Sequence, residues 1–415
     1  QDEDPLFALV RRAKPYESPP RHEYDAVVAM LAEGIATRRG RAGALLHRDE
    51  VARKLKGRKA ARLTAITSGG AIPDNANFDV ILEPEGIKIG TVDEDFAVES
   101  MAGDVFLLGN DAWRIRRVES GKVRVEAAPG ASPTIPFWLG EAPSRTVDLS
   151  AEVASLREEI SRLLDRSPEA AAAFLQRECG LDRRGSQLLC DYIAAGKAAL
   201  GEVPTQTTLI AERFFDEAGG MQLVIHAPFG GRINRAFGLA LRKRFCRSFD
   251  FELQAAATDD GVLLSLGPQH SFPLASIFEF LHPNTLQEVL EQAVLQAPMF
   301  GTRFRWVASR ALALPRYQGG RRVPPPLQRM RSDDLLAAVF PAQTGCQDNR
   351  NAGETIEVPD HPLVVETMRD CLEEALDAEG LRRIVEDIQA GRIRTLARET
   401  PEPSVFSHEI LNANP

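Results

Sequence analysis

The residues best suited to binding chemistry stand in the run Thr67-Ser68-Gly69-Gly70. Two hydroxyl side chains followed by two glycines in a predicted loop allow backbone amides and side-chain donors to approach a phosphate closely, because glycine has no Cβ. Taken alone, such a run is more often an ordinary turn than a binding site. Ile72 follows it and has two interpretations, an apolar wedge between bases or a residue that caps a core. The run therefore predicts a phosphate contact that other features must support.

A second candidate is Trp138, in the segment PFWLGE that begins at Pro136. The flanking proline and glycine favour an exposed edge or loop, where an indole ring can serve as a stacking platform for a base. Each stacked base contributes roughly 1 to 3 kcal/mol to the binding of a single strand. The alternative is a core position, as we predict for Trp113, which lies in a strand pattern.

Two clusters of basic residues could contact a sugar-phosphate backbone. Between positions 38 and 62 there are ten Lys or Arg residues against two acidic residues, a net charge of +8. Between positions 231 and 247 six cations occur with no acidic residue among them. Each neutralised phosphate releases counterions and strengthens binding at low salt, although acidic neighbours elsewhere in the fold would cancel this effect. The candidate contacts are Arg38, Arg39, Arg41, Arg232, Arg235 and Arg242.

The sequence shows no recognisable catalytic or metal-binding pattern. The seven histidines have no H-E-x-x-H spacing, and His226, at the end of an apolar strand pattern, is interpreted as a packed residue. The acidic run at 93–95 is interpreted as a charged turn before Phe96. The five cysteines contain no C-x-x-C pair, so free and mostly buried thiols are expected. We therefore predict no catalytic residue and no bound metal.

Composition indicates a multidomain protein with well-packed cores. The 415 residues are 44% hydrophobic and 26% charged, which is typical of globular domains. No run approaches the ~20 apolar residues that cross a bilayer, and the N-terminus has no leader-like pattern, so we expect a cytoplasmic protein without membrane contact. The net charge of −9 is spread unevenly and is a poor guide to partners. Both ends, at Gln1 and Pro415, are expected to be cut from a longer chain.

The elements that must position these residues indicate an α+β, multidomain chain. Two helical patterns and a short hairpin near Arg38 indicate a winged helix, and five short apolar runs between 78 and 127 indicate a β-barrel. The expected parts are a winged-helix-like domain at 1–61, a small all-β, barrel-like domain at 62–148, a helical region at 149–204, an α/β subdomain at 205–330 and a C-terminal helical segment at 331–415.

Some single elements are predicted more sharply. A buried strand is expected at 221–227, a helix at 231–249 and a hairpin across residues 258–260. Helices are also expected to begin near Asp49 and to span 205–217. The three prolines at 324–326 favour a rigid spacer.

Four segments of the chain resemble the large helicase-related family. They are AITSGGAIPD from Ala65, IPFWLGE from Ile135, HAPFGGRIN from His226 and RSDDL from Arg331. The resemblance covers most of the chain and implies a winged helix and a DEAD/H-associated region. It also implies that Ile72 and Trp138 touch DNA. In this family the whole protein is a superfamily 2, ATP-dependent translocase that moves 3′ to 5′ on single-stranded DNA and unwinds DNA duplexes and DNA–RNA hybrids.

The resemblance also draws attention to an ATP-binding motif that this chain does not contain. The motor domains of the family bind ATP, and we expect Mg²⁺ with it, but the chain has no phosphate-binding G-x-x-x-x-G-K-[ST] run. We therefore expect no cofactor in this chain and no ATPase activity of the chain alone. The motor domains of the same parent polypeptide are expected partners.

Three hypotheses about function follow. The leading one is that the chain is the accessory part of a helicase, which binds single-stranded DNA and helps to separate DNA duplexes and DNA–RNA hybrids. The acidic C-terminal helices favour a second hypothesis, a protein-interaction or assembly module without nucleic-acid contact. The third is a winged-helix regulator that reads duplex DNA through a recognition helix.

Overall fold

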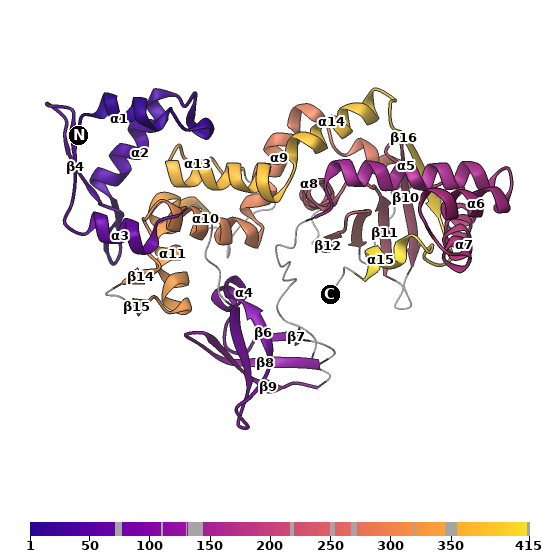
Figure 1. Cartoon of the computed structure of the whole chain (residues 1–415), viewed down its shortest axis with the longest axis horizontal. Helices are drawn as coiled ribbons and strands as arrows, with labels where there is room; N and C mark the ends of the chain where they lie inside the picture. Colours follow the sequence, from indigo (N-terminus) through magenta and orange to yellow (C-terminus); the bar gives the residue numbers. More distant parts are fainter. Residues whose placement is uncertain are drawn as a thin grey trace. The chain divides into compact units, whose positions relative to one another are not determined.

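The structure is a computed structural model that describes residues 1–70, 77–108, 111–129, 131, 144–215, 220–249, 254–266, 272–318, 321–344 and 355–412. The chain divides into two compact units, each assembled from two stretches (Figure 1). The first unit contains Gln1–Gly140 and Leu295–Cys371, and the second contains Glu141–Val294 and Leu372–Pro415. The segments predicted at 205–330 and 331–415 are therefore each divided between the units.

The first unit begins with helices and two hairpins. Their bounds are α1 (Glu3–Val10), the 3-10 turn η1 (Lys14–Tyr16), α2 (Arg21–Glu33), β1 (Ile35–Thr37), β2 (Gly40–Ala42), β3 (Leu46–Asp49), β4 (Lys54–Gly57) and α3 (Ala61–Ser68). Gly34 ends α2 with a φ of 68°, and a Cβ there would lie 2.7 Å from the carbonyl oxygen of Ala42. Glycine is therefore required where the chain turns from α2 into the β1–β2 hairpin.

The helix predicted to begin near Asp49 is wrong, because β3 and β4 pair there as an antiparallel hairpin. The Asp49 carboxylate accepts a hydrogen bond from the amide of Ala52 at 2.9 Å, and Arg53 has a φ of 50°. This tight turn reverses the chain before a helix can form. It also brings Leu55 into the core, where that side chain is buried.

The five strands predicted between positions 78 and 127 are present and form one sheet. They are β5 (Asn77–Leu82), β6 (Ile87–Asp93), β7 (Val105–Leu108), β8 (Asp111–Glu119) and β9 (Lys122–Ala127), in the order β6-β5-β9-β8-β7. β5 and β9 run parallel, and the other neighbours are antiparallel. Alternate side chains, among them Phe78, Val80 and Ile115, share a core with Phe96. Phe96 belongs to α4 (Glu94–Glu99), a short helix between β6 and β7.

The later stretch of the first unit is mainly helical. It contains α10 (Pro298–Arg310), the strands β14 (Tyr317–Gln318) and β15 (Arg321–Arg322), α11 (Pro325–Val339), α12 (Pro341–Thr344) and α13 (Pro362–Arg369). α11 packs against β1 and α4, and α13 packs against α2. The spacer predicted at 324–326 is wrong, because Pro324 is the N-cap of α11 and the next two prolines occupy its first turn. First-turn amides have no partner within a helix, so proline is tolerated there.

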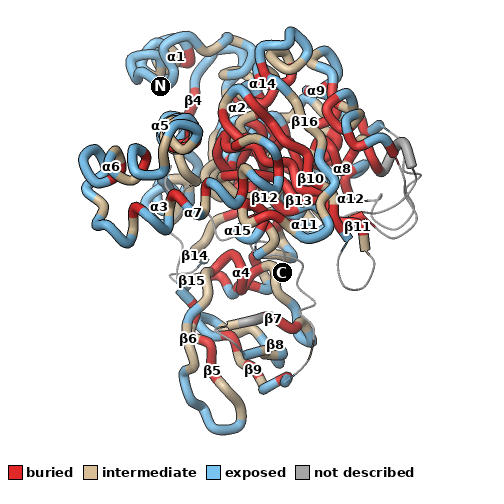
Figure 2. The backbone as a smooth tube through the Cα atoms, turned by 90° about the vertical axis from the view of Figure 1, so that its right-hand side faces the viewer, coloured by how far each residue is buried: buried red, intermediate tan, exposed pale blue. Residues whose placement is uncertain are grey.

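The second unit is built on a mixed five-stranded sheet. Its strands are β10 (Thr208–Phe215), β11 (Met221–His226), β12 (Gln254–Ala257), β13 (Gly261–Leu266) and β16 (Arg394–Glu399), in the order β12-β13-β11-β10-β16. β10 and β16 run parallel, whereas the other neighbours are antiparallel. Figure 2 shows buried backbone along β10, β11 and β13. The predicted strand at 221–227 and the hairpin across 258–260 are confirmed.

The helix predicted over 205–217 is wrong, because this segment is the strand β10. Almost all of its residues are buried, including Leu209, Ile210 and Ala211. A strand buried on both faces shows a continuous apolar run rather than a two-residue alternation, and such a run cannot be distinguished from a buried helix by periodicity.

Helices pack around this sheet. α8 (Gly231–Phe249) packs against β12 and β13 and has the bounds predicted from the sequence. The other helical segments of the chain are α5 (Val147–Leu164), α6 (Pro168–Glu178), α7 (Arg183–Leu200), η2 (Leu274–Glu279), α9 (Pro283–Leu295), the π-helical turn η3 (Asp370–Ala375), α14 (Ala378–Gln389) and α15 (Ser407–Leu411). Within the described residues, no helix is long and apolar enough to cross a membrane.

Candidate nucleic-acid interface

Two predicted DNA contacts, Ile72 and Trp138, lie outside the described residues, in the stretches 71–76 and 132–143. Their roles as a wedge and as a stacking platform therefore stay predictions. The residues that lead into the first of these stretches are described, and they line a cavity within the first unit.

Thr67 and Ser68 form the end of α3, and Gly69 is the C-cap of that helix, so the loop predicted for them is wrong. The Thr67 hydroxyl donates to the carbonyl oxygen of Leu63 at 2.9 Å, and the Gly69 amide donates to that of Ala65 at 3.0 Å. Both predicted donors are thus used inside the helix. The Ser68 hydroxyl is different, because its oxygen is buried and has no hydrogen-bond partner among the described residues.

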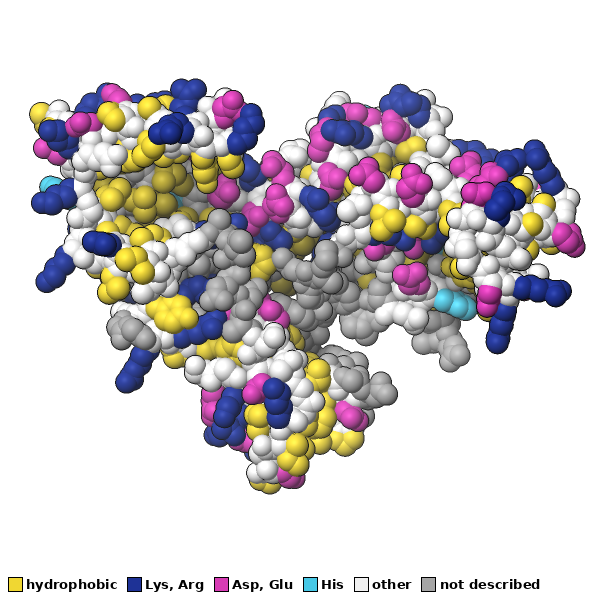
Figure 3. Space-filling model, in the orientation of Figure 1, with side chains coloured by type: hydrophobic (Ala, Val, Ile, Leu, Met, Phe, Trp, Pro, Cys, Tyr) yellow, Lys and Arg dark blue, Asp and Glu magenta, His cyan; other side chains and the backbone are white. Residues whose placement is uncertain are grey.

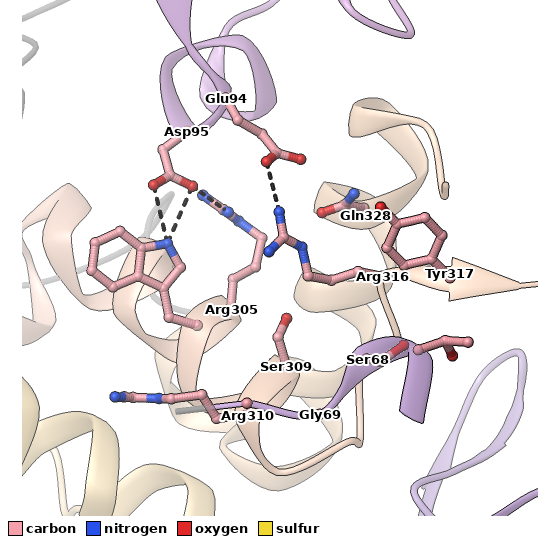
Figure 4. Close-up of a pocket in the computed structure, with 13 residues that line it drawn as sticks. Ser68, Gly69, Glu94, Asp95, Arg305, Ser309, Arg310, Arg316, Tyr317 and Gln328 are labelled. Carbon is pink, nitrogen blue, oxygen red and sulfur yellow. Dashed lines mark hydrogen bonds and ion pairs between the residues drawn. The ribbon is translucent and has the colours of Figure 1, made fainter. Parts of the chain in front are cut away.

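The cavity beside Ser68 has a volume of about 110 Å³. It lies among the end of α3, the start of α4, α10, the Arg316–Tyr317 segment and α11 (Figure 4). Its walls beyond α3 carry Glu94, Asp95, Arg305, Trp306, Ser309, Arg310, Arg316, Tyr317 and Gln328. Guanidinium, carboxylate, hydroxyl and aromatic groups surround one polar space, which suits a charged or strongly polar ligand.

Asp95 at the start of α4 is the centre of a buried ion network. It accepts hydrogen bonds from Arg305 at 2.6 Å and from the indole nitrogen of Trp306 at 3.1 Å (Figure 4). Arg305 also donates to Glu99 at 2.8 Å. Burial by itself lowers the pKa of the Arg305 guanidinium, but the carboxylates of Asp95 and Glu99 outweigh burial and raise it. The cation therefore keeps its charge inside the fold.

Glu94, beside Asp95, is buried as well. Its carboxylate accepts a hydrogen bond from Arg316 at 2.8 Å and pairs with Arg322. The charged turn predicted at 93–95 is therefore wrong: Asp93 caps α4, and both following acids face arginines from a later stretch of the chain. The basic residues that neutralise these acids lie more than 200 positions away, so their pairing was invisible to local patterns.

The basic hairpins near the N-terminus are exposed. Arg38 stands in the turn between β1 and β2, whereas Arg39 pairs with Asp334 and Arg41 donates to the carbonyl oxygen of Glu33 at 2.7 Å. Lys and Arg side chains project around this part of the molecule in Figure 3. Five exposed cations of this stretch form neither an ion pair nor a side-chain hydrogen bond within the described parts of the chain, and we call them the hairpin cations: Arg38, Lys54, Lys56, Lys59 and Arg62.

The predicted basic face of α8 is largely engaged with its own unit. Arg232 is exposed and donates to the carbonyl oxygens of Glu373 and Leu376, the latter at 3.0 Å. Arg235 donates to the Ser144 hydroxyl at 2.7 Å, and Arg242 is half-buried. Carbonyl oxygens of Glu373 and Leu376 accept from the first, and the Ser144 hydroxyl accepts from the second. A DNA contact of Arg232, Arg235 or Arg242 stays a prediction.

Two family descriptions match the chain over most of its length. "Large helicase-related protein, winged helix domain" matches residues 1–135, and "DEAD/H associated" matches residues 203–407. The chain belongs to the large helicase-related (Lhr) family.

The curated relatives that the chain matches are longer Lhr proteins. It is 31% identical to the "Lhr helicase/ probable uracil glycosylase" of Mycolicibacterium smegmatis, over 99% of this chain and 26% of that protein. It is 25% identical to the "ATP-dependent helicase Lhr-Core" of Saccharolobus solfataricus, over 99% of this chain and 46% of that protein. The chain thus spans between about a quarter and about half of the length of the curated relatives it matches.

A solved structure of an Lhr protein has the same fold. The structure of Mycobacterium smegmatis helicase Lhr bound to ssDNA and AMP-PNP superposes with a TM-score of 0.73 at 27% identity, covering 99% of this chain and 46% of that one. The Lhr neighbour is thus a nucleic-acid complex.

Sequence reasoning missed most of the cavity. Ser309, Arg310, Arg316 and Tyr317 carry no motif that an Lhr-like pattern or a local spacing would single out. The one available signal was the mixture of arginine and aromatic residues from Arg303 to Trp306. Among the described residues, no group of three His, Cys, Asp or Glu side chains could hold a metal ion.

Proposed function

We propose that this chain is the part of an Lhr-type, ATP-dependent 3′–5′ helicase that binds single-stranded DNA and helps to separate DNA duplexes and DNA–RNA hybrids. The observation that carries the proposal is the match over 99% of the chain to an Lhr structure bound to single-stranded DNA. The exposed hairpin cations add to it, because unpaired cations on a surface attract a phosphate backbone.

In this proposal the chain has an accessory role. Relatives named as ATP-dependent helicases are about twice as long as this chain. We infer that motor domains elsewhere in the parent polypeptide bind ATP with Mg²⁺ and supply the movement. The present chain then binds the single strand and forms part of the site where the two strands of the duplex separate.

The first test is fluorescence anisotropy of a labelled single-stranded oligonucleotide with the 415-residue chain and with Trp138→Ala. If the indole stacks on a base, the substitution should weaken binding about tenfold, within the roughly 1 to 3 kcal/mol expected for one stacked base. Tyr16→Ala is the matched control, because Tyr16 is a surface aromatic residue with 56% exposure. Equal affinities of the parent chain and Trp138→Ala would remove Trp138 from the interface.

The second test concerns the hairpin cations. The triple variant Arg38→Ala, Lys54→Ala and Lys56→Ala should bind the single strand more weakly and lower the slope of log affinity against log salt by about 2, since each neutralised phosphate contributes about 0.7. The matched control removes three cations that already pair with surface glutamates, Arg162, Arg177 and Arg383. Equal slopes for the two triple variants would contradict a specific role of the hairpins. A parent chain that binds no single strand at low salt would contradict the proposed function and favour an interaction module.

A further inference from the structure

The chain passes from the first unit to the second inside a helix, not in a loop. One boundary between the units falls between Cys371 and Leu372. Both residues belong to the π-helical turn η3 (Asp370–Ala375), which directly continues α13. A π-helix has i→i+5 hydrogen bonds, is rare, and occurs mostly as single turns at functional sites or kinks. This rare element thus coincides with a connection between two compact units.

The sequence explains why a π-helical turn forms at this position. Buried pairs of residues recur every four positions along α13 and η3: Leu363 and Val364, Thr367 and Met368, Cys371 and Leu372, Ala375 and Leu376. In an α-helix, a strict four-residue repeat drifts around the helix axis by about 40° per repeat. A π turn contains more residues than an α turn and therefore counteracts this drift. The pairs stay buried along the whole segment as a result.

The two ends of η3 are held by residues of different units. Asp370, its first residue, pairs with two arginines of α10 in the first unit, Arg303 at 3.1 Å and Arg310 at 3.0 Å. After its last residue, the carbonyl oxygen of Leu376 accepts a hydrogen bond from Arg232 on α8 of the second unit at 3.0 Å. Each unit thus fixes one end of η3, so a change of orientation has to be absorbed by the residues between these two ends.

A second described link between the units is also short. The boundary between Val294 and Leu295 lies at the end of α9, and α10 begins at Pro298, so only residues 296–297 separate the two helices. Within the first unit, α10 packs against α13. Both described links therefore lead into one pair of packed helices, whereas the third passage, at residue 140, lies outside the described residues. Hinges between domains consist of a few such residues at the ends of elements.

We propose that η3, together with the turn at 296–297, is a hinge at which the two units change their relative orientation. A π turn can pass to an α turn by exchanging i→i+5 for i→i+4 hydrogen bonds, so the backbone groups remain paired while the helix axis bends. The hinge goes beyond the proposed function and does not depend on DNA binding.

The first test measures single-molecule FRET between the units of the 415-residue chain in the absence of DNA. Dyes are attached through an azide-bearing amino acid at two exposed positions, His22 on α2 and Ala170 on α6. The variant lacks Glu374, an exposed residue of η3. This deletion leaves spacings of four, four and three between the buried pairs, close on average to the about 3.6 residues of an α turn. The FRET distribution should be broad in the parent chain and narrower in the deletion variant.

Hydrogen exchange checks that this narrowing arises at the π turn. In the parent chain, peptides that cover 370–376 should exchange about tenfold faster than those of α13 and α14, because the hinge opens locally. In the deletion variant these peptides should exchange as slowly as their neighbours. Glu374→Ala is the matched control, since it removes the same side chain and keeps the number of residues. It should match the parent chain in both measurements.

Arg232→Ala is a second variant that leaves the length of η3 unchanged, and it serves even if the deletion prevents folding. Loss of the hydrogen bond to Leu376 should broaden the FRET distribution and accelerate exchange at 370–376. Arg383→Ala should do neither, because Arg383 is exposed on α14 and pairs with a glutamate of its own helix. A single narrow distribution in the parent chain, or equal distributions in the parent chain and the folded variants, would overturn the hinge. A failure of the proposed function would leave these measurements unaffected, since no DNA is present.

Discussion

Replacing Asp95 by alanine should lower the free energy of unfolding of the first unit by about 3 to 5 kcal/mol, because it leaves a buried cation partly uncompensated. Asp95 and Arg305 are 3% and 5% exposed, and their charged groups lie 2.6 Å apart. The same carboxylate accepts the indole hydrogen of Trp306. Denaturant unfolding combined with hydrogen exchange of peptides from α4 and α10 measures the effect in this unit.

The control for this prediction is Asp79→Ala in β5 of the same unit. Asp79 pairs with Lys88 at 2.6 Å, but both side chains are well exposed. Exposed ion pairs contribute about 0 to 1 kcal/mol, so this substitution should have little effect. Similar losses for Asp95→Ala and Asp79→Ala would show that burial of the α4 network does not matter for stability.

Replacing Glu212 by alanine should lower the free energy of unfolding of the second unit by a similar amount, about 3 to 5 kcal/mol. Glu212 on β10 is fully buried and accepts hydrogen bonds from His226 at 2.7 Å and from the Ser407 hydroxyl at 2.6 Å. It also accepts hydrogen bonds from Thr400 and from the amide and hydroxyl of Ser404. One carboxylate thus holds the segment between β16 and α15 on the sheet.

Local measurements should show where the second unit loosens. In Glu212→Ala, hydrogen exchange should accelerate first in peptides that cover 400–411. Glu202→Ala is the control, because Glu202 pairs with Arg394 at 3.1 Å on the exposed surface of the same unit. Unchanged exchange at 400–411 in Glu212→Ala would contradict the role assigned to this carboxylate.

The pH dependence of the stability of the second unit should follow from the titration of the Glu212 carboxylate. Burial raises the pKa of Glu212, but the hydrogen bonds from His226, Ser407 and Ser404 and the charge of His226 outweigh burial and lower it from 4.5 to about 2. A folded-state pKa below the unfolded value means that the stabilisation, about 3 kcal/mol, is present above pH 4.5 and is lost as pH falls towards 2. Glu212→Ala should therefore show a flatter loss of stability between pH 5 and pH 2 than the parent chain.

Local patterns in the sequence were enough to predict several helices and strands and the family to which the chain belongs. The strands between 78 and 127, the helix Gly231–Phe249 and the hairpin across 258–260 each carry a periodicity and turn residues that report burial along a short stretch. The segments that resemble Lhr proteins pointed to the family that the comparisons identify.

Only the tertiary structure decided which distant segments meet. The parallel pairing of β10 with β16 joins Thr208 to Arg394, and no local pattern specifies a partner so far along the chain. The acids of α4 are buried because arginines of a later stretch neutralise them. The Ser68 hydroxyl faces a cavity for the same reason, since α10 and β14 supply its other walls. The residues of one segment determine its periodicity. The ion-pair and hydrogen-bond partners of a buried side chain depend on long-range packing instead.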